Sequence, residues 1–108
     1  MMYFDFEAGN QQYKLRLNTR NIIALEEKLG GKNPLSIFGN GDRLPSIKEM
    51  VAILWASLQQ YHHGITLNDT ENIFDAYLEE HIPTDFIATI VEIYKVSGLI
   101  KEEDSEKN

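Results

Sequence analysis

The sequence predicts a mainly α-helical domain that begins with a β-hairpin, and three observations support this prediction. The segment Ser46–Gly64 is apolar around most of its circumference and carries signals for both a helix start and a helix stop. Alternating apolar and polar residues surround a turn signal near the amino end. Three further segments repeat apolar residues at helical spacing. We therefore expect four main helices, with the others packed around the helix at 46–63.

Two antiparallel strands are predicted at about residues 2–7 and 12–17. Gly9 and Asn10 lie between them, and both residue types tolerate the positive φ that hairpin turns use. Because side chains alternate across a strand, the apolar residues of each strand should share one face. These residues are Phe4, Phe6, Tyr13, Leu15 and Leu17. An isolated hairpin is marginally stable in water, so it should lie on the helices or pair with another copy's edge.

The first helix is predicted at 19–29. Asn18 or Thr19 can cap its amino end, and Gly30 stands in the stop position. Further along, the stretch Gly39–Asp42 combines two glycines with two turn-forming polar residues. We expect a mobile loop there, before the central helix begins.

The central helix is predicted at 46–63. Ser46 and Glu49 have the spacing of a capping box, in which each side chain pairs with a backbone N–H of the other residue. Gly64 then supplies the stop. A helix that is apolar on nearly every side should be covered on every side. Trp55 is therefore expected in the core, with an exposed anchor for a partner as the alternative.

Two more helices are predicted at 69–81 and 84–97. Asn68 or Asp69 begins the first of them, and it ends before a proline, because the residue before proline is pushed out of the helical conformation. Thr84 can cap the second helix. Both helices carry apolar positions at helical spacing, which should face the central helix.

The length of 108 residues predicts one domain, at 1–100, because so short a chain cannot support two cores. Residues 101–108 contain no apolar side chain, and we expect an acidic disordered tail there. The net charge of −7 disfavours the phosphate contacts that drive nucleic-acid binding. Neither a signal-peptide pattern nor an apolar run long enough to cross a bilayer is present, so a cytoplasmic location is expected.

The sequence contains no pattern that indicates catalysis, a cofactor or a metal. The absence of cysteine excludes thiol catalysis and zinc–thiolate sites. His62 and His63 are adjacent, so on a helix they project about 100° apart and do not form a chelating pair. Side chains such as these, near a helix end, are better explained by the negative helix dipole. With His81 as the only other histidine, we expect no metal, no catalytic residue and no enzymatic activity.

Three carboxylates recur at a spacing of four residues and would line one helix face. They belong to Glu71, Asp75 and Glu79. An acidic face opposite an apolar one is ordinarily solvated, and the alternative is a contact surface for a basic partner. Together with Trp55, these residues are the candidate partner contacts that the sequence offers.

Most of the chain, from Tyr13 to Ile100, carries a recognisable series of segments. They are YKLRLNTRNIIALEEKLGGKNPLSIF, LPSIKEMVAILWASLQQYHHGITLNDT and YLEEHIPTDFIATIVEIYKVSGLI. Their most characteristic pieces are Asn-Pro-Leu after the first helix, Tyr-His-His-Gly-Ile at the end of the central helix, and Lys-Val-Ser-Gly near the close. In these segments the chain resembles the tail assembly chaperones of long-tailed phages and prophages of Gram-positive bacteria.

The resemblance implies a non-enzymatic protein made in the cytoplasm of the infected bacterium. It would bind the tape measure protein, help the major tail protein polymerise around it, and leave before the virion is complete. In such families a frameshifted longer product often shares this domain, and the two products would diverge at 101–108. The physical task would be to cover apolar helix faces of a long, aggregation-prone partner.

A small acidic regulator or adaptor is the rival hypothesis. It would bind a basic protein partner through the face that carries Glu71, Asp75 and Glu79. Self-association is also expected, because a hairpin has free edges and the chain has more large apolar residues than four helices need.

Overall fold

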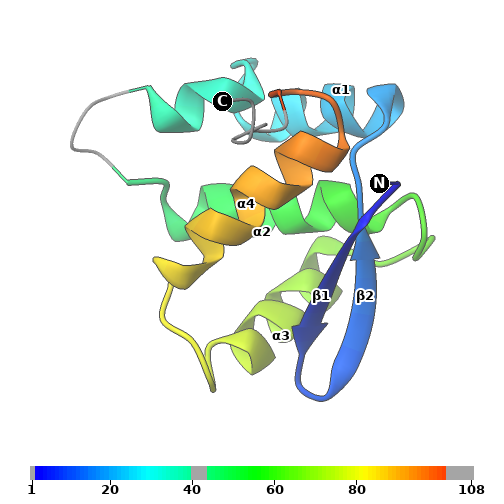
Figure 1. Ribbon diagram of the computed structural model, residues 1–108, viewed down its shortest axis with the longest axis vertical. Helices are drawn as coiled ribbons and strands as arrows, with labels where there is room; N and C mark the ends of the chain where they lie inside the picture. The colour runs from blue at the N-terminus through cyan, green and yellow to red at the C-terminus, as the bar shows by residue number, and fades with distance from the viewer. Residues whose placement is uncertain (1, 40–43, 102–108) are drawn as a thin grey trace, which may run out of the picture.

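The computed structural model describes residues 2–39 and 44–101. Within these ranges the chain forms the predicted hairpin followed by four α-helices, so the predicted fold class is confirmed. The elements are β1 (Phe4–Ala8), β2 (Gln11–Leu15), α1 (Thr19–Lys28), the 3-10 helix η1 (Pro34–Phe38), α2 (Ile47–Leu58), α3 (Leu67–Tyr77) and α4 (Asp85–Val96). In Figure 1, α2 runs through the middle of the molecule, with α1 above it and α3 below it.

Two predictions fall mainly outside the described residues. The expected mobile loop at Gly39–Asp42 lies outside them apart from Gly39. The expected tail at 101–108 lies outside them apart from Lys101.

The hairpin turn consists of only two residues, Gly9 and Asn10, which have φ values of 59° and 65°. Positive φ at both central residues is the pattern of a type I′ turn, whose twist matches that of paired strands. Ala8 pairs with Gln11 directly across the turn, so both strands extend closer to it than the predicted 2–7 and 12–17. A side chain at Gly9 would also meet the Cβ of Ala76 at 3.0 Å, which favours glycine there.

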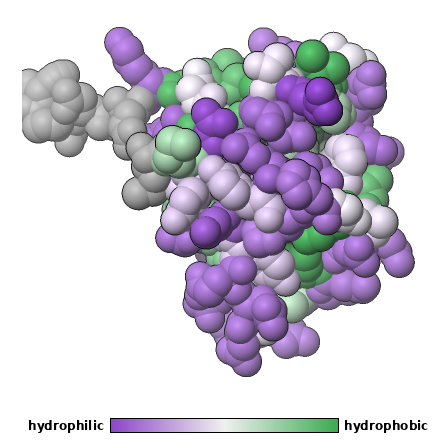
Figure 2. Space-filling view, turned by 90° about the vertical axis from the view of Figure 1, so that its right-hand side faces the viewer, coloured by the Kyte–Doolittle hydropathy of each residue, from purple (hydrophilic) through white to green (hydrophobic). Residues whose placement is uncertain are grey.

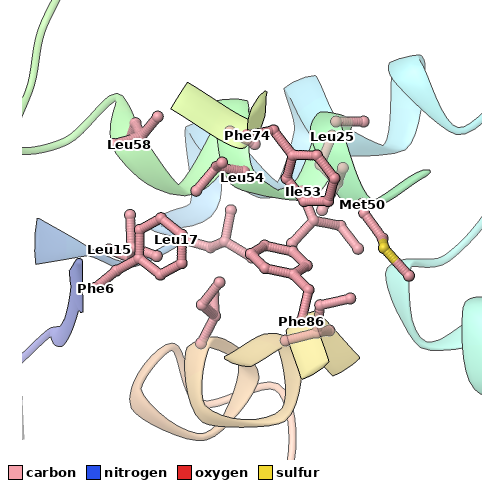
Figure 3. Packing of buried hydrophobic residues seen from close by; sticks show 14 of the residues in the cluster. Phe6, Leu15, Leu17, Leu25, Met50, Ile53, Leu54, Leu58, Phe74 and Phe86 are labelled. Carbon is pink, nitrogen blue, oxygen red and sulfur yellow. The ribbon is translucent and has the colours of Figure 1, made fainter. Parts of the chain in front are cut away.

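The central position predicted for α2 is confirmed by its neighbours. α2 contacts α1, α3, α4 and β2. Its residues Ile53, Leu54 and Leu58 have no exposed surface. Figure 3 shows these side chains and Phe86 of α4 pointing into the same core. One buried cluster therefore joins the helices on the two sides of α2.

The predicted apolar face of the hairpin is also confirmed. Phe6, Leu15 and Leu17 are buried, and Phe4 and Tyr13 are partly buried against the core. The hairpin therefore lies on the helices, which supplies the support that an isolated hairpin lacks.

A cluster of aromatic rings fixes β1 onto α3 and α4. The ring centroid of Phe6 lies 5.2 Å from that of Tyr77 and 5.9 Å from that of Phe86. Phe86 also meets Phe74 edge-on, with centroids 5.4 Å apart and an interplanar angle of 82°. Edge-on contacts at these distances are favoured by the ring quadrupoles and add to the gain from burial.

α1 has the predicted cap and stop. The Asn18 Oδ1 accepts a hydrogen bond from the backbone N–H of Asn21 at 2.9 Å. Gly30 has a φ of 74°, as a helix-ending glycine requires. The helix covers Thr19–Lys28, close to the predicted 19–29.

α2 covers Ile47–Leu58 instead of the predicted 46–63. The Gln59 side chain explains the earlier end, because its Nε2 donates to the backbone carbonyls of Trp55 at 3.0 Å and Ile65 at 2.9 Å. The Trp55 carbonyl is the acceptor that the next helical turn would use. The side chain thus ends the helix and ties the returning chain to it.

The start of α3 differs from the prediction. Thr66 is the cap, not Asn68 or Asp69: its Oγ1 accepts from the N–H of Asp69 at 2.9 Å, and the Asp69 carboxylate accepts from the N–H of Thr66 at 3.0 Å. This capping box begins α3 at Leu67, earlier than the predicted range 69–81, and α3 ends at Tyr77. Aspartate replaces the Glu or Gln that usually marks the motif.

α4 covers Asp85–Val96, within the predicted 84–97, and Thr84 occupies its predicted N-cap position. Thr84 makes no side-chain cap bond. Instead the Asp85 carboxylate accepts from the N–H of Ile82 at 3.2 Å, and the N–H of Phe86 donates to the carbonyl of Pro83 at 3.0 Å. A tight turn that contains the proline therefore begins the helix.

The far end of α4 is fixed by two polar contacts between distant parts of the chain. The Tyr94 hydroxyl donates to the carbonyl of Pro34 at 2.9 Å. Tyr94 is fully buried, and this burial raises its pKa. The Ser97 Oγ accepts from the N–H of Leu17 at 2.8 Å, just after β2.

Candidate functional site

The exposed stripe of α2 consists of Ile47, Val51 and Trp55, whose spacing of four places them on one side of the helix. Ile47 is 47% exposed, whereas Val51 and Trp55 are partly buried. The prediction that α2 is covered on every side is therefore wrong along this stripe, as far as the described residues are concerned. α1 and α3 pack beside α2 and border the stripe without closing over it.

A groove of about 470 Å³ lies along the amino-terminal half of this stripe. We call it the α2 groove. Its lining is mostly apolar, with charged side chains from three helices. The lining residues are Ile47, Val51 and Ala52 with Lys48 from α2, Leu67 with Glu71 from α3, and Lys28 from α1. Such a surface suits a partner that presents apolar side chains between charged ones.

Two capping boxes position the apolar residues at one end of the groove. Ser46 Oγ accepts from the N–H of Glu49 at 3.0 Å, and the Glu49 carboxylate accepts from the N–H of Ser46 at 2.8 Å. This predicted box begins α2 at Ile47. The box at the start of α3 places Leu67 in the same way. Both residues therefore lie at rigid helix starts.

Trp55 is the last residue of the stripe, beyond the α2 groove. The Lys28 Nζ lies 5.2 Å from its ring centroid, within the range of a cation–π contact. Beyond Trp55, a second depression of about 530 Å³ has a mixed lining that includes the polar side chains of Asn21 and Gln59. Trp55 is thus neither enclosed in the core nor an isolated exposed anchor, and its contact with Lys28 connects it to the α2 groove.

The three candidate carboxylates are all exposed, but the structure does not keep them together on one helix. Glu71 lines the α2 groove. Asp75 follows it one turn later on α3, away from the groove lining. Glu79 lies in the turn that follows α3, because the helix ends at Tyr77. Of the three, Glu71 alone joins the surface that contains Ile47 and Val51.

Two of the histidines, His62 and His81, have structural contacts. His62 Nε2 accepts a hydrogen bond from the backbone N–H of Lys14 at 2.9 Å. Burial and the nearby Lys14 charge lower the pKa of His62, which favours the neutral form that can accept this bond. His81 stacks on Tyr77 with ring centroids 4.3 Å apart and lies 3.4 Å from the Asp85 carboxylate. Within 2–39 and 44–101, no three metal-ligating side chains are grouped as an ion would need.

Sequence reasoning missed the groove, although part of its signal was present. Ile47, Val51 and Trp55 have helical spacing, but so do the residues of the core. Lys28 and Leu67 come from other helices, and only the tertiary packing brings them beside α2. Periodicity identifies an apolar face without stating which neighbour will cover it.

The fold and the groove define a mainly helical domain with an apolar groove on its surface. The chain belongs to a family of unknown function (DUF6096), whose profile matches residues 5–107. No curated protein and no solved structure matches it. Among the residues that the structure describes, no helix combines the length and apolar character needed to cross a membrane.

Proposed function

We propose that this protein is a phage tail assembly chaperone that binds the tape measure protein and promotes tail-tube polymerisation without enzymatic activity. The observation that carries the proposal is the α2 groove, an apolar surface at rigid helix starts. The resemblance of the segments between Tyr13 and Ile100 supplies the biological setting. In this proposal the protein acts in the host cytoplasm and is absent from the mature virion.

The partner's chemistry follows from the lining of the groove. An amphipathic helix would place apolar side chains, spaced by three or four residues, against Ile47, Val51 and Leu67. Lys28 and Lys48 would attract carboxylates at the edge of that helix. A long helical tape measure protein exposes such apolar faces until tail subunits cover them. Covering them in the meantime would keep the protein from aggregating.

Ile47→Asp tests this proposal without disturbing the fold. Ile47 is the first residue of α2, where an acidic side chain interacts favourably with the helix dipole. Aspartate there would remove apolar contact area and place a charge in the interface. We expect a loss of at least about ten-fold in affinity for the co-expressed tape measure protein, which corresponds to about 1.4 kcal/mol.

Ile23→Asp is the matched control. Ile23 is 53% exposed on α1 and does not line the α2 groove, so the same substitution should leave binding unchanged. The measurements are pull-down of the complex and the soluble fraction of the tape measure protein with each variant. No complex with the wild-type chain would refute the chaperone function. A complex that tolerates Ile47→Asp would refute the groove as its site.

The acidic regulator remains the second candidate, because Glu71, Asp75 and Glu79 are all exposed. Reversing these charges to lysine should abolish capture of a basic partner if this candidate is correct. If the partner binds in the α2 groove, the affinity should change less, and only with Glu71→Lys. Comparing the affinity of that single variant with those of Asp75→Lys and Glu79→Lys therefore separates the two proposals.

A further inference from the structure

The two outer edges of the hairpin differ. Along β2, the backbone N–H of Lys14 donates to His62 Nε2, and that of Arg16 donates to the carbonyl of Ser57, both at 2.9 Å. The end of α2 and the segment after it therefore cover this edge. Figure 2, which looks at the side of the molecule where β2 lies in Figure 1, shows a mostly hydrophilic surface with separate hydrophobic patches.

Along β1, the backbone of Asp5 and Glu7 faces away from the hairpin. Asp5 pairs with Lys14, whose N–H points outward to His62. In an antiparallel pair, the partner of an outward-facing residue also faces outward. Glu7 lies two residues further and has the same orientation. Within the described ranges, neither residue makes a backbone hydrogen bond outside the hairpin.

A depression of about 310 Å³ lies beside this open edge. Its lining includes Phe4–Glu7 of β1, and the other residues come from α3, α4 and the turn between them: Tyr77, His81, Asp85 and Thr89. A third strand would lie about 4.8 Å from β1. The depression therefore adjoins the space that such a strand would occupy.

The charges of the depression determine which strand would fit. Asp5, Glu7 and Asp85 contribute carboxylates, and no lysine or arginine of the described part of the chain lines it. A second copy that paired through its own β1 would bring Asp5 and Glu7 close to the same carboxylates of its partner, and like charges across strands are destabilising. The prediction of free hairpin edges thus holds for β1 alone, and its charges disfavour self-pairing.

We propose that the β1 edge binds an extended basic segment of a partner protein as a third strand. The partner's backbone would pair with the N–H and C=O groups of Asp5 and Glu7. Its lysine or arginine side chains would lie beside these carboxylates, and the alternating smaller apolar side chains would point toward Phe4 and Tyr77. This surface is separate from the α2 groove, so the inference does not depend on the proposed function.

A blocked peptide of alternating lysine and valine tests the proposal with the full chain. Amide hydrogen exchange by NMR should slow at Asp5 and Glu7 when the peptide is added. A peptide of the same sequence, N-methylated at alternate amides, keeps its charge but cannot pair with a strand, and it should lose both binding and protection. The double variant Asp5→Asn, Glu7→Gln should bind the unmodified peptide roughly five-fold more weakly, because two exposed ion pairs are lost.

Two outcomes would overturn the proposal. Equal binding of the N-methylated peptide would show that charge attraction alone is involved. No binding of the unmodified peptide would mean that the carboxylates only protect the edge from aggregation. Ile47→Asp should bind the peptide like the wild-type chain, so failure here is distinguishable from failure of the chaperone proposal.

Discussion

Two sets of apolar residues on α2 have different surroundings. Ile53, Leu54 and Leu58 are fully enclosed, whereas Ile47 is 47% exposed and Val51 is partly covered. Residue type cannot explain the difference, because isoleucine occurs in both sets. Helical periodicity does not explain it either, because Leu54 and Leu58 lie on the same side of the helix as Ile47. The packing of α1 and α3 explains it, since they border Ile47 and Val51 without closing over them. An apolar helical residue therefore becomes buried or exposed according to which elements reach it.

The largest expected effect is at the fully enclosed residues of α2. Leu54→Ala should lower the free energy of unfolding by about 2–5 kcal/mol, because it removes buried contacts and leaves a cavity. Val51→Ala should lower it clearly less, because Val51 is partly exposed already. Urea denaturation of both variants measures the difference. Equal losses would contradict the distinction between the enclosed and the exposed residues of α2.

The next largest effect on the free energy of unfolding is expected at the buried hydroxyl of Tyr94. Tyr94→Phe removes its hydrogen bond to the Pro34 carbonyl and should lower the free energy of unfolding by about 1–3 kcal/mol. The ring itself stays in place, so binding at the α2 groove should not change. Chemical denaturation checks the stability, and an unchanged midpoint would mean that this bond contributes little.

The start of α2 connects stability with the groove. Ser46→Ala removes the acceptor for the Glu49 N–H and should lower the free energy of unfolding by about 1 kcal/mol. Ser46→Asp keeps an acceptor and should retain the wild-type value. The partner's affinity should fall with the alanine variant, because Ile47 follows the cap directly. Loss of stability by both variants alike would argue against the cap.

The smallest effect concerns pH. The pKa of His62 is lowered in the folded protein by burial and by Lys14. Below about pH 6.5 the unfolded chain therefore binds a proton at His62 more readily than the folded protein does. The free energy of unfolding should fall as the pH drops from 6.5 toward the lowered pKa, and the stabilisation by neutral His62 should be fully present above about pH 6.5.

His62→Gln keeps a hydrogen-bond acceptor for the Lys14 N–H but does not titrate. The difference in unfolding free energy between wild type and this variant, followed with pH, isolates the contribution of His62. A difference that does not change between pH 7 and pH 5 would contradict it.

The sequence predicted the elements of this fold better than their ends. Ser46 and Glu49 predicted the start of α2 because both partners of the capping box lie within one turn. Its end could not be predicted in this way, because Gln59 acts through the carbonyl of Ile65 in a later segment. Thr66 and Asp69 form a box that the sequence does contain, with aspartate at the position where glutamate is usual.

The candidate site was predicted only in part. Trp55 and Glu71 were identified from the sequence. Lys28 connects them, because it contacts the ring of Trp55 and lines the α2 groove together with Glu71. Asp75 and Glu79 share the spacing of Glu71 but lie outside that lining. Ile47 looked like a core residue, because its spacing matches that of the buried side chains. Whether α1 and α3 cover it depends on tertiary packing, which periodicity does not encode.

The most direct measurement is methyl NMR of the full chain, titrated with an apolar helical segment of the tape measure protein. If the exposed stripe of α2 is the contact surface, methyl signals of Ile47, Val51 and Leu67 should shift with the segment's concentration. Signals of the fully enclosed Leu54 and Leu58 should move much less. Shifts confined to other surfaces, with those of Ile47 and Val51 unchanged, would contradict the account.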